Sequence, residues 1–306
     1  MKIIVFHQPY PMGNYKYNTA IAHNLSKHHE VYLLEQLNGQ PATIEYINQI
    51  KELEADVVYF DMLDLETFKI IEKLKCKKVL GYVTRGLLGW DEIFDYKDKW
   101  FTHVFTNSLS MAKKFKSKNV PTEHFEWFLN AVPQEEMEFD SKYHHECVFL
   151  GMGFTRVTNE EYKLERETFF NGFPEIDFKI YGNGWPNLPY YKGLLPSNDI
   201  GKLYSSAKSG IGIIEKEQRT KGMINNRYSE MGSCGIPIVS YNYDTIDWFG
   251  AEKYINFITN KQEAKENIKD IINNPEKYKI KSDNLKEFTT NQHKMFFEKL
   301  SHLITK

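Results

Sequence analysis

The chain has 306 residues, which is long enough for two domains of ordinary size, and its 41% hydrophobic content allows a substantial core. Its 39 basic and 41 acidic residues leave a formal net charge of −2. This balance excludes a global field that would draw the protein onto nucleic acid or an anionic membrane, although local basic patches stay compatible with it.

The N-terminal sequence "MKIIVFHQPYP" holds an apolar run of only four residues before His7, which is too short for a secretory signal. Elsewhere the chain lacks the run of about 18 apolar residues that a membrane-spanning helix needs. We therefore expect a cytoplasmic protein with no stable membrane insertion. Cys76, Cys147 and Cys234 lie far apart without CxxC spacing, so reduced thiols are expected rather than a disulfide framework or a zinc site.

Short β-branched or aromatic runs alternate with helical patterns through the first half, which is typical of βαβ units and a parallel sheet. Helical patterns include "TAIAHNLSKHH" and "TIEYINQIKELE". A sixth strand candidate is "EHFEWF". The five clearest strands are predicted at Lys2–His7, Val31–Glu35, Asp56–Phe60, Lys77–Thr84 and His103–Ser108.

A polar, acidic and non-periodic segment, "NAVPQEEMEFDSKYHHE", follows the first half and is the best linker in the chain. The βα pattern then restarts with strands expected in "CVFLGMG", "DFKIYGNGW", "SGIGIIEK" and "IPIVSYN". Helices are expected in "NEEYKLERETFFNG", "SNDIGKLYSSAK" and "NNRYSEMGS". The fold class is therefore α/β, with two successive halves of similar size that suggest a cleft between them.

The last part of the chain, from Gln262 to Ile304, is predicted mostly as helix, broken near "NNPEKYKIKSD" by asparagines and a proline. Its end can pack back on the first half. The predicted domains are 1-130, a linker at 131-146, a second domain at 147-285 and a C-terminal helix at 286-306.

Ligands of open α/β sheets bind beyond the carboxyl ends of the strands, so functional residues are expected in the turns there. The turn "GMGFTR" follows the first strand of the second half. Its glycines allow a close backbone approach, the next helix start favours an anion, and Arg156 suits a phosphate. A tight turn with a surface arginine is the alternative. For "GNGW", a glycine-rich turn in which Trp185 packs is favoured over a ligand wall.

Arg227 and Glu230 lie three residues apart in "NNRYSEMGS", so on a helix they share one face, and Asn225 or Asn226 can cap its start. An arginine there can neutralise a diphosphate, while a glutamate one turn later can accept two hydrogen bonds from a ribose diol. The pattern thus suits a nucleotide. A surface ion pair worth a few tenths of a kcal/mol is the alternative for such a spacing.

The second half resembles the C-terminal domains of GT-B glycosyltransferases, with "GMGFTR", "DFKIYGNGW", "YYKGLLPSNDIGKLYSSAKSGIGII" and "INNRYSEMGSCGIPIVS" in order and at similar spacing. It is most similar to the CgeB-like, or spore maturation protein, group. The opening "HQPYPMGNYKYNTAIAHNLSKHHEVYLLE" more weakly resembles group 1 glycosyltransferases. Phage DNA β-glucosyltransferases also share the RxxE arrangement. The resemblance implies two Rossmann-like domains that face a cleft.

The resemblance further implies a nucleotide-sugar donor, a UDP-sugar, held by the second domain, and no cofactor besides this co-substrate. Glu230 would bind the ribose, and Arg227 and Arg156 the diphosphate. Gly151 and Gly153 would allow the close backbone approach, and the base would rest near Tyr181 or Gly182. A NAD-dependent oxidoreductase is a poorer fit, because "HQPYPMGNY" has no GxGxxG after the first strand.

Many retaining group 1 enzymes have a second glutamate eight residues before the one that matches Glu230, where this chain has Gly222. Its absence favours an inverting reaction, in which a base deprotonates an acceptor hydroxyl. The first domain offers Asp91, in the long loop "TRGLLGWDEIF", and then His7, directly after the first strand. Related inverting enzymes place an aspartate nearer the strand end, where this chain has Thr84 and Arg85.

No DxD pair lies where a metal is expected, and arginines with helix N-termini can stabilise the leaving diphosphate, so metal-independent transfer is predicted. The expected activity is hexose transfer to a hydroxyl acceptor, which is a glycan, a protein or a hydroxymethylated base in DNA. The near-neutral charge counts mildly against DNA. A non-catalytic nucleotide-sugar-binding module is the alternative from another functional class.

Overall fold

In the computed structural model, the chain forms two compact units. Unit 1 comprises Met1–Glu126, Lys221–Met223 and Lys294–Lys306, and unit 2 comprises Trp127–Thr220 and Ile224–His293. The residues that the structure describes are 1–7, 17–35, 43–61, 76, 78–82, 102–106, 108–125, 138–153 and 158–305.

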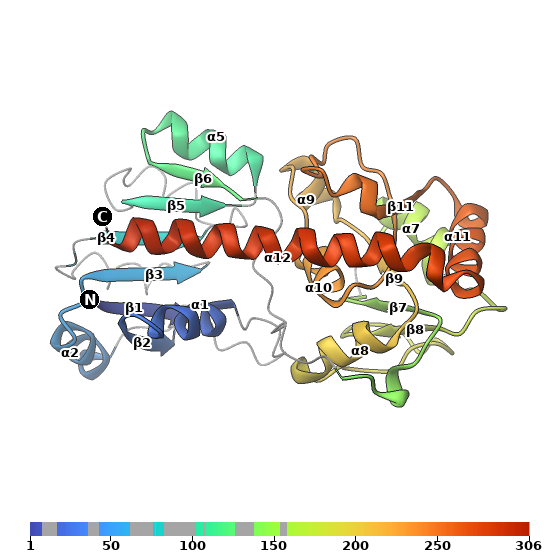
Figure 1. Cartoon of the computed structure of the whole chain (residues 1–306), viewed down its shortest axis with the longest axis horizontal. Coiled ribbons are helices and arrows are strands. Elements are labelled where there is room, and N and C mark those ends of the chain that lie inside the picture. The colour runs from blue at the N-terminus through green and yellow to red at the C-terminus, as the bar shows by residue number, and fades with distance from the viewer. Residues whose placement is uncertain are drawn as a thin grey trace. The chain divides into compact units, whose positions relative to one another are not determined.

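Unit 1 contains a six-stranded sheet in the order β2-β1-β3-β4-β5-β6, and every pairing in it is parallel (Figure 1). Side chains of β1 from Ile3 to Phe6 are fully buried, as expected for a central strand covered on both faces. The strands are β1 (Lys2–His7), β2 (Glu30–Glu35), β3 (Val57–Asp61), β4 (Lys78–Tyr82), β5 (His103–Thr106) and β6 (Thr122–His124).

Helices connect the strands of unit 1 where the sequence carries helical patterns and caps. They are α1 (Tyr17–Ser26), α2 (Ile44–Glu52) and α5 (Leu109–Ser117). Thr43 caps α2 through a bond from the Tyr46 amide, and Ser108 caps α5 through a bond from the Met111 amide. These side chains satisfy amides that the first helical turn leaves free.

The last turns of the long helix α12 (Pro275–Thr305) belong to unit 1, as the sequence suggested for the end of the chain. The Phe296 ring lies 5.1 Å from Phe105 and 5.3 Å from Phe125, measured between ring centroids. Lys299 forms an ion pair with Glu123 of β6. An aromatic cluster therefore fixes the end of the chain to the first sheet.

Unit 2 contains a five-stranded parallel sheet in the order β11-β10-β9-β7-β8 (Figure 1). Each sheet thus places its second strand outside its first and the later strands on the other side, as in doubly wound folds. Two Rossmann-like units result, which confirms the predicted α/β class. The strands are β7 (Cys147–Leu150), β8 (Phe178–Tyr181), β9 (Gly210–Gly212), β10 (Ile238–Tyr241) and β11 (Ile255–Ile258).

Short helical segments connect the strands of unit 2. The α-helices are α7 (Lys163–Glu165), α8 (Ile200–Ser206), α9 (Lys216–Thr220), α10 (Asn226–Cys234), α11 (Lys261–Asn273) and the first part of α12. Single turns of 3₁₀-helix are η1 (Ser141–Tyr143), η2 (Glu160–Tyr162), η4 (Ser197–Asp199) and η5 (Glu252–Tyr254), and η3 (Arg166–Phe170) is a π-helix. Gly235 ends α10 with a φ of 67°, a left-handed conformation that favours glycine.

Some elements differ from the sequence prediction. The strand β11 and the helix α9 were not predicted, and α12 begins at Pro275. The described end of the segment predicted as a linker, residues 138–146, is part of unit 2. There Tyr143 is 1% exposed and donates to Asp199 at 2.7 Å. The buried Tyr143 ring and its hydrogen bond therefore hold this otherwise polar segment in place.

Candidate functional site

The order of strands in unit 2 defines a place for a ligand. The chain passes from β7 to β8 on one side and returns to β9 on the other, so the switch point where a ligand is expected lies between the ends of β7 and β9. Leu150 is the last residue of β7, and Ile213 follows β9 directly. The backbone at these two points frames the candidate site.

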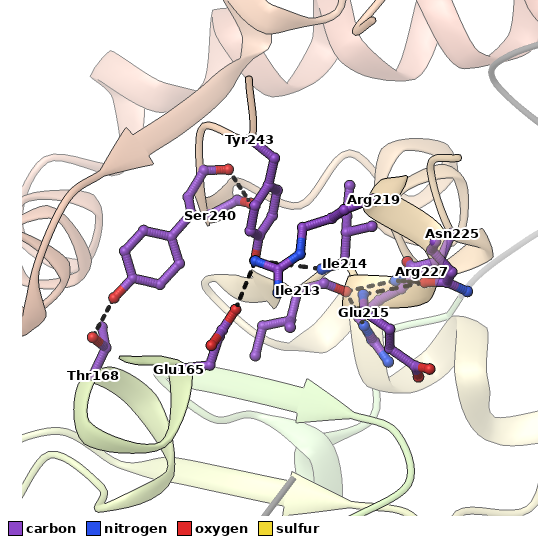
Figure 2. Close-up of polar contacts among 12 residues, drawn as sticks. Glu165, Thr168, Ile213, Ile214, Glu215, Arg219, Asn225, Arg227, Ser240 and Tyr243 are labelled. Atoms are coloured by element: carbon purple, nitrogen blue, oxygen red, sulfur yellow. Dashed lines mark hydrogen bonds and ion pairs between the residues drawn. The ribbon is translucent and has the colours of Figure 1, made fainter. Parts of the chain in front are cut away.

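Arg227 of α10 bridges the ends of β7 and β9. Its Nε donates to the Leu150 carbonyl at 2.5 Å. Its Nη1 donates to the Ile213 carbonyl at 3.0 Å (Figure 2). Its guanidinium carbon lies 4.5 Å from the centroid of the Phe149 ring. Two backbone acceptors and an aromatic face thus fix the guanidinium, and no described residue accepts from its Nη2, which stays available to an anion.

The Arg227 guanidinium occupies the space in which a side chain at position 151 would lie, and the glycine there leaves that space open. A Cβ at Gly151 would lie 2.5 Å from Arg227 Nη2, closer than such atoms approach. Trp185 Nε1 donates to the Gly151 carbonyl at 2.7 Å, and the Trp185 ring fills the space beside Gly153. In the structure, the groups that closely approach the backbone of these two glycines are therefore the protein's own Arg227 and Trp185 side chains. Gly182 has a φ of +132° and lies against the Gly151 backbone.

Glu230 lies one turn after Arg227 on α10 and is 6% exposed. Within the described chain, no donor is hydrogen-bonded to its carboxylate. Burial raises the pKa of Glu230 to about 7, against the opposing effect of the Arg227 charge. A buried carboxylate without donors is unfavourable unless something else supplies them, so this group marks a candidate ligand site.

Asn225 precedes α10 and takes the N-cap position without a side-chain cap bond. Its Nδ2 donates instead to the Ile213 carbonyl at 2.5 Å and to Gln218 Oε1 at 3.4 Å (Figure 2). The sequence predicted an asparagine cap here, and the side chain has this different role. Asn225 therefore does not cap the first amides of α10, and the positive end of this helix lies beside Arg227.

Tyr181, expected near the nucleotide base, ends β8 and is 6% exposed. Its hydroxyl shares a hydrogen bond of 3.0 Å with His145 Nε2, whose Nδ1 lies 2.9 Å from Asp177. Burial raises the pKa of Tyr181 to about 12, so the phenol stays neutral. The adjacent Gly182 carbonyl accepts from Tyr191 at 2.7 Å.

Three other residues were predicted to belong to the site. Arg156 and Asp91 lie outside the described residues. The backbone of His7 ends β1, but its side chain is not described. Their predicted roles therefore stay predictions, as does the cleft between the two domains.

Sequence reasoning missed the carbonyls of Leu150 and Ile213 as anchors of Arg227, and the buried Tyr204 discussed below. Every residue has a carbonyl, so residue identity carries no signal for such an anchor. Among the described residues, no group of three or more His, Cys, Asp or Glu side chains could hold a metal ion. No helix of the described chain is long and apolar enough to cross a membrane.

Residues 164–295 match the family model described as glycosyl transferase-like. None of the curated proteins matches the sequence. The match covers less than half of the chain, and the fold is that of GT-B glycosyltransferases. These findings confirm the resemblance to glycosyltransferases and the fold of two Rossmann-like units expected from the sequence.

Solved structures share this fold at low sequence identity. T4 phage BGT with UDP-glucose aligns at 14% identity over 96% of this chain and 97% of its own, with a TM-score of 0.62. A β-glucosyltransferase described as a DNA modifying enzyme aligns at 12% over all of both chains, with a TM-score of 0.64. Anabaena HepE with UDP and glucose aligns at 13% over 99% and 100%, with a TM-score of 0.59.

The fold also occurs in a protein of a different named activity. A putative UDP-N-acetylglucosamine 2-epimerase from Listeria monocytogenes aligns at 11% identity over 100% of this chain and 97% of its own, with a TM-score of 0.56. At these identities the likeness shows the fold alone, and the reaction has to be argued from the site.

Proposed function

We propose that this protein transfers a hexose from a nucleoside-diphosphate sugar, UDP-glucose or a close relative, to a hydroxyl acceptor. The observation that carries the proposal is the buried Glu230 carboxylate without a donor, next to the anchored Arg227 guanidinium at the end of β7 and β9. A ribose diol supplies the missing donors, and a diphosphate supplies the anion. UDP and UDP-glucose are the ligands named for neighbours of the same fold.

Each group of the site has a role in this proposal. Glu230 accepts two hydrogen bonds from the ribose diol. Arg227, through Nη2, and Arg156 neutralise the diphosphate together with the uncapped start of α10. The backbone of Gly151, Gly153 and Gly182 borders the nucleotide, with the base near Tyr181.

The proposed reaction is an inverting displacement without a metal ion. A base removes the proton of the acceptor hydroxyl while its oxygen attacks the anomeric carbon, and the nucleoside diphosphate leaves. Asp91 is the first candidate for the base and His7 the second. Arg227 and the α10 N-terminus stabilise the negative charge that develops on the leaving group. Gly222 has a φ of 61°, which a glutamate would adopt only with strain, so the backbone does not favour the second glutamate of retaining enzymes.

The acceptor can be a glycan, a protein or a hydroxymethylated base in DNA. The last is supported by the DNA modifying enzyme among the structural neighbours. Cytoplasmic location stays a prediction of the sequence. A nucleotide-sugar-binding module without catalysis is the alternative, because the base is not fixed by the described residues.

Binding is tested first, by thermal unfolding with UDP, GDP and TDP and their sugars. A ligand at 100 times its Kd should stabilise the protein by about 2.7 kcal/mol. Glu230→Ala should abolish the shift. Glu165→Gln is the control, since it alters another buried carboxylate of the same unit, paired with Arg219 at 3.3 Å. A UDP shift that survives Glu230→Ala would refute the proposed site.

Catalysis is tested separately by incubation with UDP-glucose. Slow release of UDP and glucose indicates a transferase, whereas a binding module shows none. Labelled UDP-glucose with hydroxymethylated and unmodified DNA then tests the DNA acceptor. Asp91→Asn and His7→Gln should each be assayed for transfer, and activity that needs a divalent ion after EDTA treatment would contradict the metal-independent mechanism.

A further inference from the structure

Like Glu230, another buried polar side chain of unit 2 has no hydrogen-bond partner among the described residues. It lies on α8, the helix that packs against α10, which carries Glu230. Tyr204 of α8 is 1% exposed, and its hydroxyl is buried without a hydrogen-bond partner among the described residues. Buried hydroxyls are almost always hydrogen-bonded, and leaving one unsatisfied destabilises the folded state. An unpaired phenol in a packed core therefore calls for a reason.

The helices α8 and α10 pack directly against each other. The Cys234 thiol of α10 donates to the Gly201 carbonyl of α8, with 4.0 Å between sulfur and oxygen. On α8, Tyr204 lies three residues after Gly201, so the two residues share a helix face. On α10, Glu230 lies four residues before Cys234, so these two also share a face. Tyr204 and Glu230 thus belong to one buried interface.

The electrostatics of Tyr204 point to the same neighbour. After burial, the charge of Glu230 is the largest cause that raises the pKa of Tyr204, well above its usual value. Arg227 and Cys234 also act on it, but a guanidinium accepts no hydrogen bond, and burial raises the pKa of the Cys234 thiol to about 12. Among these three groups, only Glu230 is a strong acceptor, and the phenol keeps its proton as a donor.

We propose that Tyr204 is a positioning residue for Glu230, whose hydroxyl donates to one carboxylate oxygen when the nucleotide is bound and so directs the carboxylate toward the ribose diol. This inference rests on the proposed function. Among the described residues neither the phenol nor the carboxylate has a hydrogen-bond partner, so each group can supply what the other lacks. The bond is charge-assisted, which makes it stronger than a neutral one.

Tyr204→Phe tests this inference with a specific combination of results. The hydroxyl makes no hydrogen bond to any described residue, so the variant should unfold at the same or a higher temperature. Its Kd for UDP, measured by calorimetry, should rise about tenfold. Tyr228→Phe is the matched control. Its hydroxyl is buried and bonded to Ser240 at 2.6 Å, so this variant should lose stability and keep the wild-type Kd.

The decisive measurement uses 2′,3′-dideoxy-UDP, which lacks the diol that Glu230 would bind. Since Tyr204 acts only through Glu230, Tyr204→Phe should bind this analogue as well as the wild-type protein does, and the two deletions should be strongly non-additive. A similar loss of affinity for UDP and for the analogue would overturn the inference and indicate a packing role for the hydroxyl.

The outcomes separate this inference from the proposed function. If the wild-type protein binds no UDP, the proposed function fails and the role of Tyr204 fails with it. If the wild-type protein binds UDP and Glu230→Ala does not, while Tyr204→Phe binds like wild type, only the role of Tyr204 is refuted.

Discussion

Glu230→Gln should make the protein more stable at neutral and alkaline pH while it removes nucleotide binding. Burial raises the pKa of the Glu230 carboxyl from 4.5 to about 7 in the folded protein. Between these values the folded chain holds a proton that the unfolded chain releases, so stability falls as the pH rises through this window. The glutamine keeps the volume of the side chain and removes the charge.

The size of the effect follows from the shift. A change of about 2.5 pKa units corresponds to about 3 kcal/mol at pH 8, where the wild-type carboxylate is ionised in both states. At pH 5 the folded carboxyl is protonated, and the advantage of the variant should shrink to about 1 kcal/mol. The quantity to measure is therefore the difference in unfolding free energy between the variant and the wild type as a function of pH.

Urea denaturation followed by circular dichroism at pH 5, 6, 7 and 8 measures this difference. Glu165→Gln is the informative control. Glu165 is 2% exposed and paired with Arg219, so its loss should destabilise the folded state at every pH in this range. The reasoning is refuted if Glu230→Gln loses stability to the same extent at pH 5 and pH 8, because that result would mean that the carboxylate is well satisfied in the folded protein.

Three more predictions follow from single contacts. Arg227→Lys should weaken UDP binding at least tenfold in calorimetry, because an ammonium group cannot reproduce the planar fork that meets two carbonyls and still faces an anion. Gly151→Ala should cost about 1–3 kcal/mol in urea denaturation and weaken UDP binding, because the new methyl group displaces the Arg227 guanidinium. Burial lowers the pKa of His103 in the folded state. The contribution of His103 to stability should therefore fall as the pH drops below 6.5. Relative to the wild type, His103→Gln should gain stability between pH 7 and pH 5 in denaturation curves.

The central strands could be predicted closely, since the strand expected over Lys2–His7 is β1 itself. Continuous apolar runs between turn signals are the strongest strand pattern of a parallel sheet. Prediction failed for β11, Ile255–Ile258, a four-residue edge strand, because so short an apolar run does not distinguish a strand from a buried helical turn. The start of α12 could have been placed better, because Pro275 is a typical first helical residue.

The placement of Arg227 and Glu230 on one helix face could be predicted from their spacing. Their different environments, an anchored guanidinium and a carboxylate without donors among the described residues, could not be predicted in this way. Spacing says nothing of the Leu150 and Ile213 carbonyls that hold the guanidinium, or of the absence of donors at the carboxylate. Those properties depend on how far β7 and β9 extend, and β9 is only three residues long. The strand pattern "SGIGIIEK" concealed this early end, and with it the carbonyl that the arginine uses.

The contrast between the two charged groups has a consequence for recognition. Arg227 is already held by the protein and changes little when an anion arrives, so its contribution to binding is preorganised. Among the described residues Glu230 has no hydrogen-bond donor, so a ligand with a diol would both form new bonds and remove the penalty of a buried, unpaired carboxylate. Loss of the diol should therefore weaken binding more than one ordinary hydrogen bond would. Under the proposed function, the carboxylate is therefore expected to set the preference for a ribonucleotide, and the arginine to set where its phosphates lie.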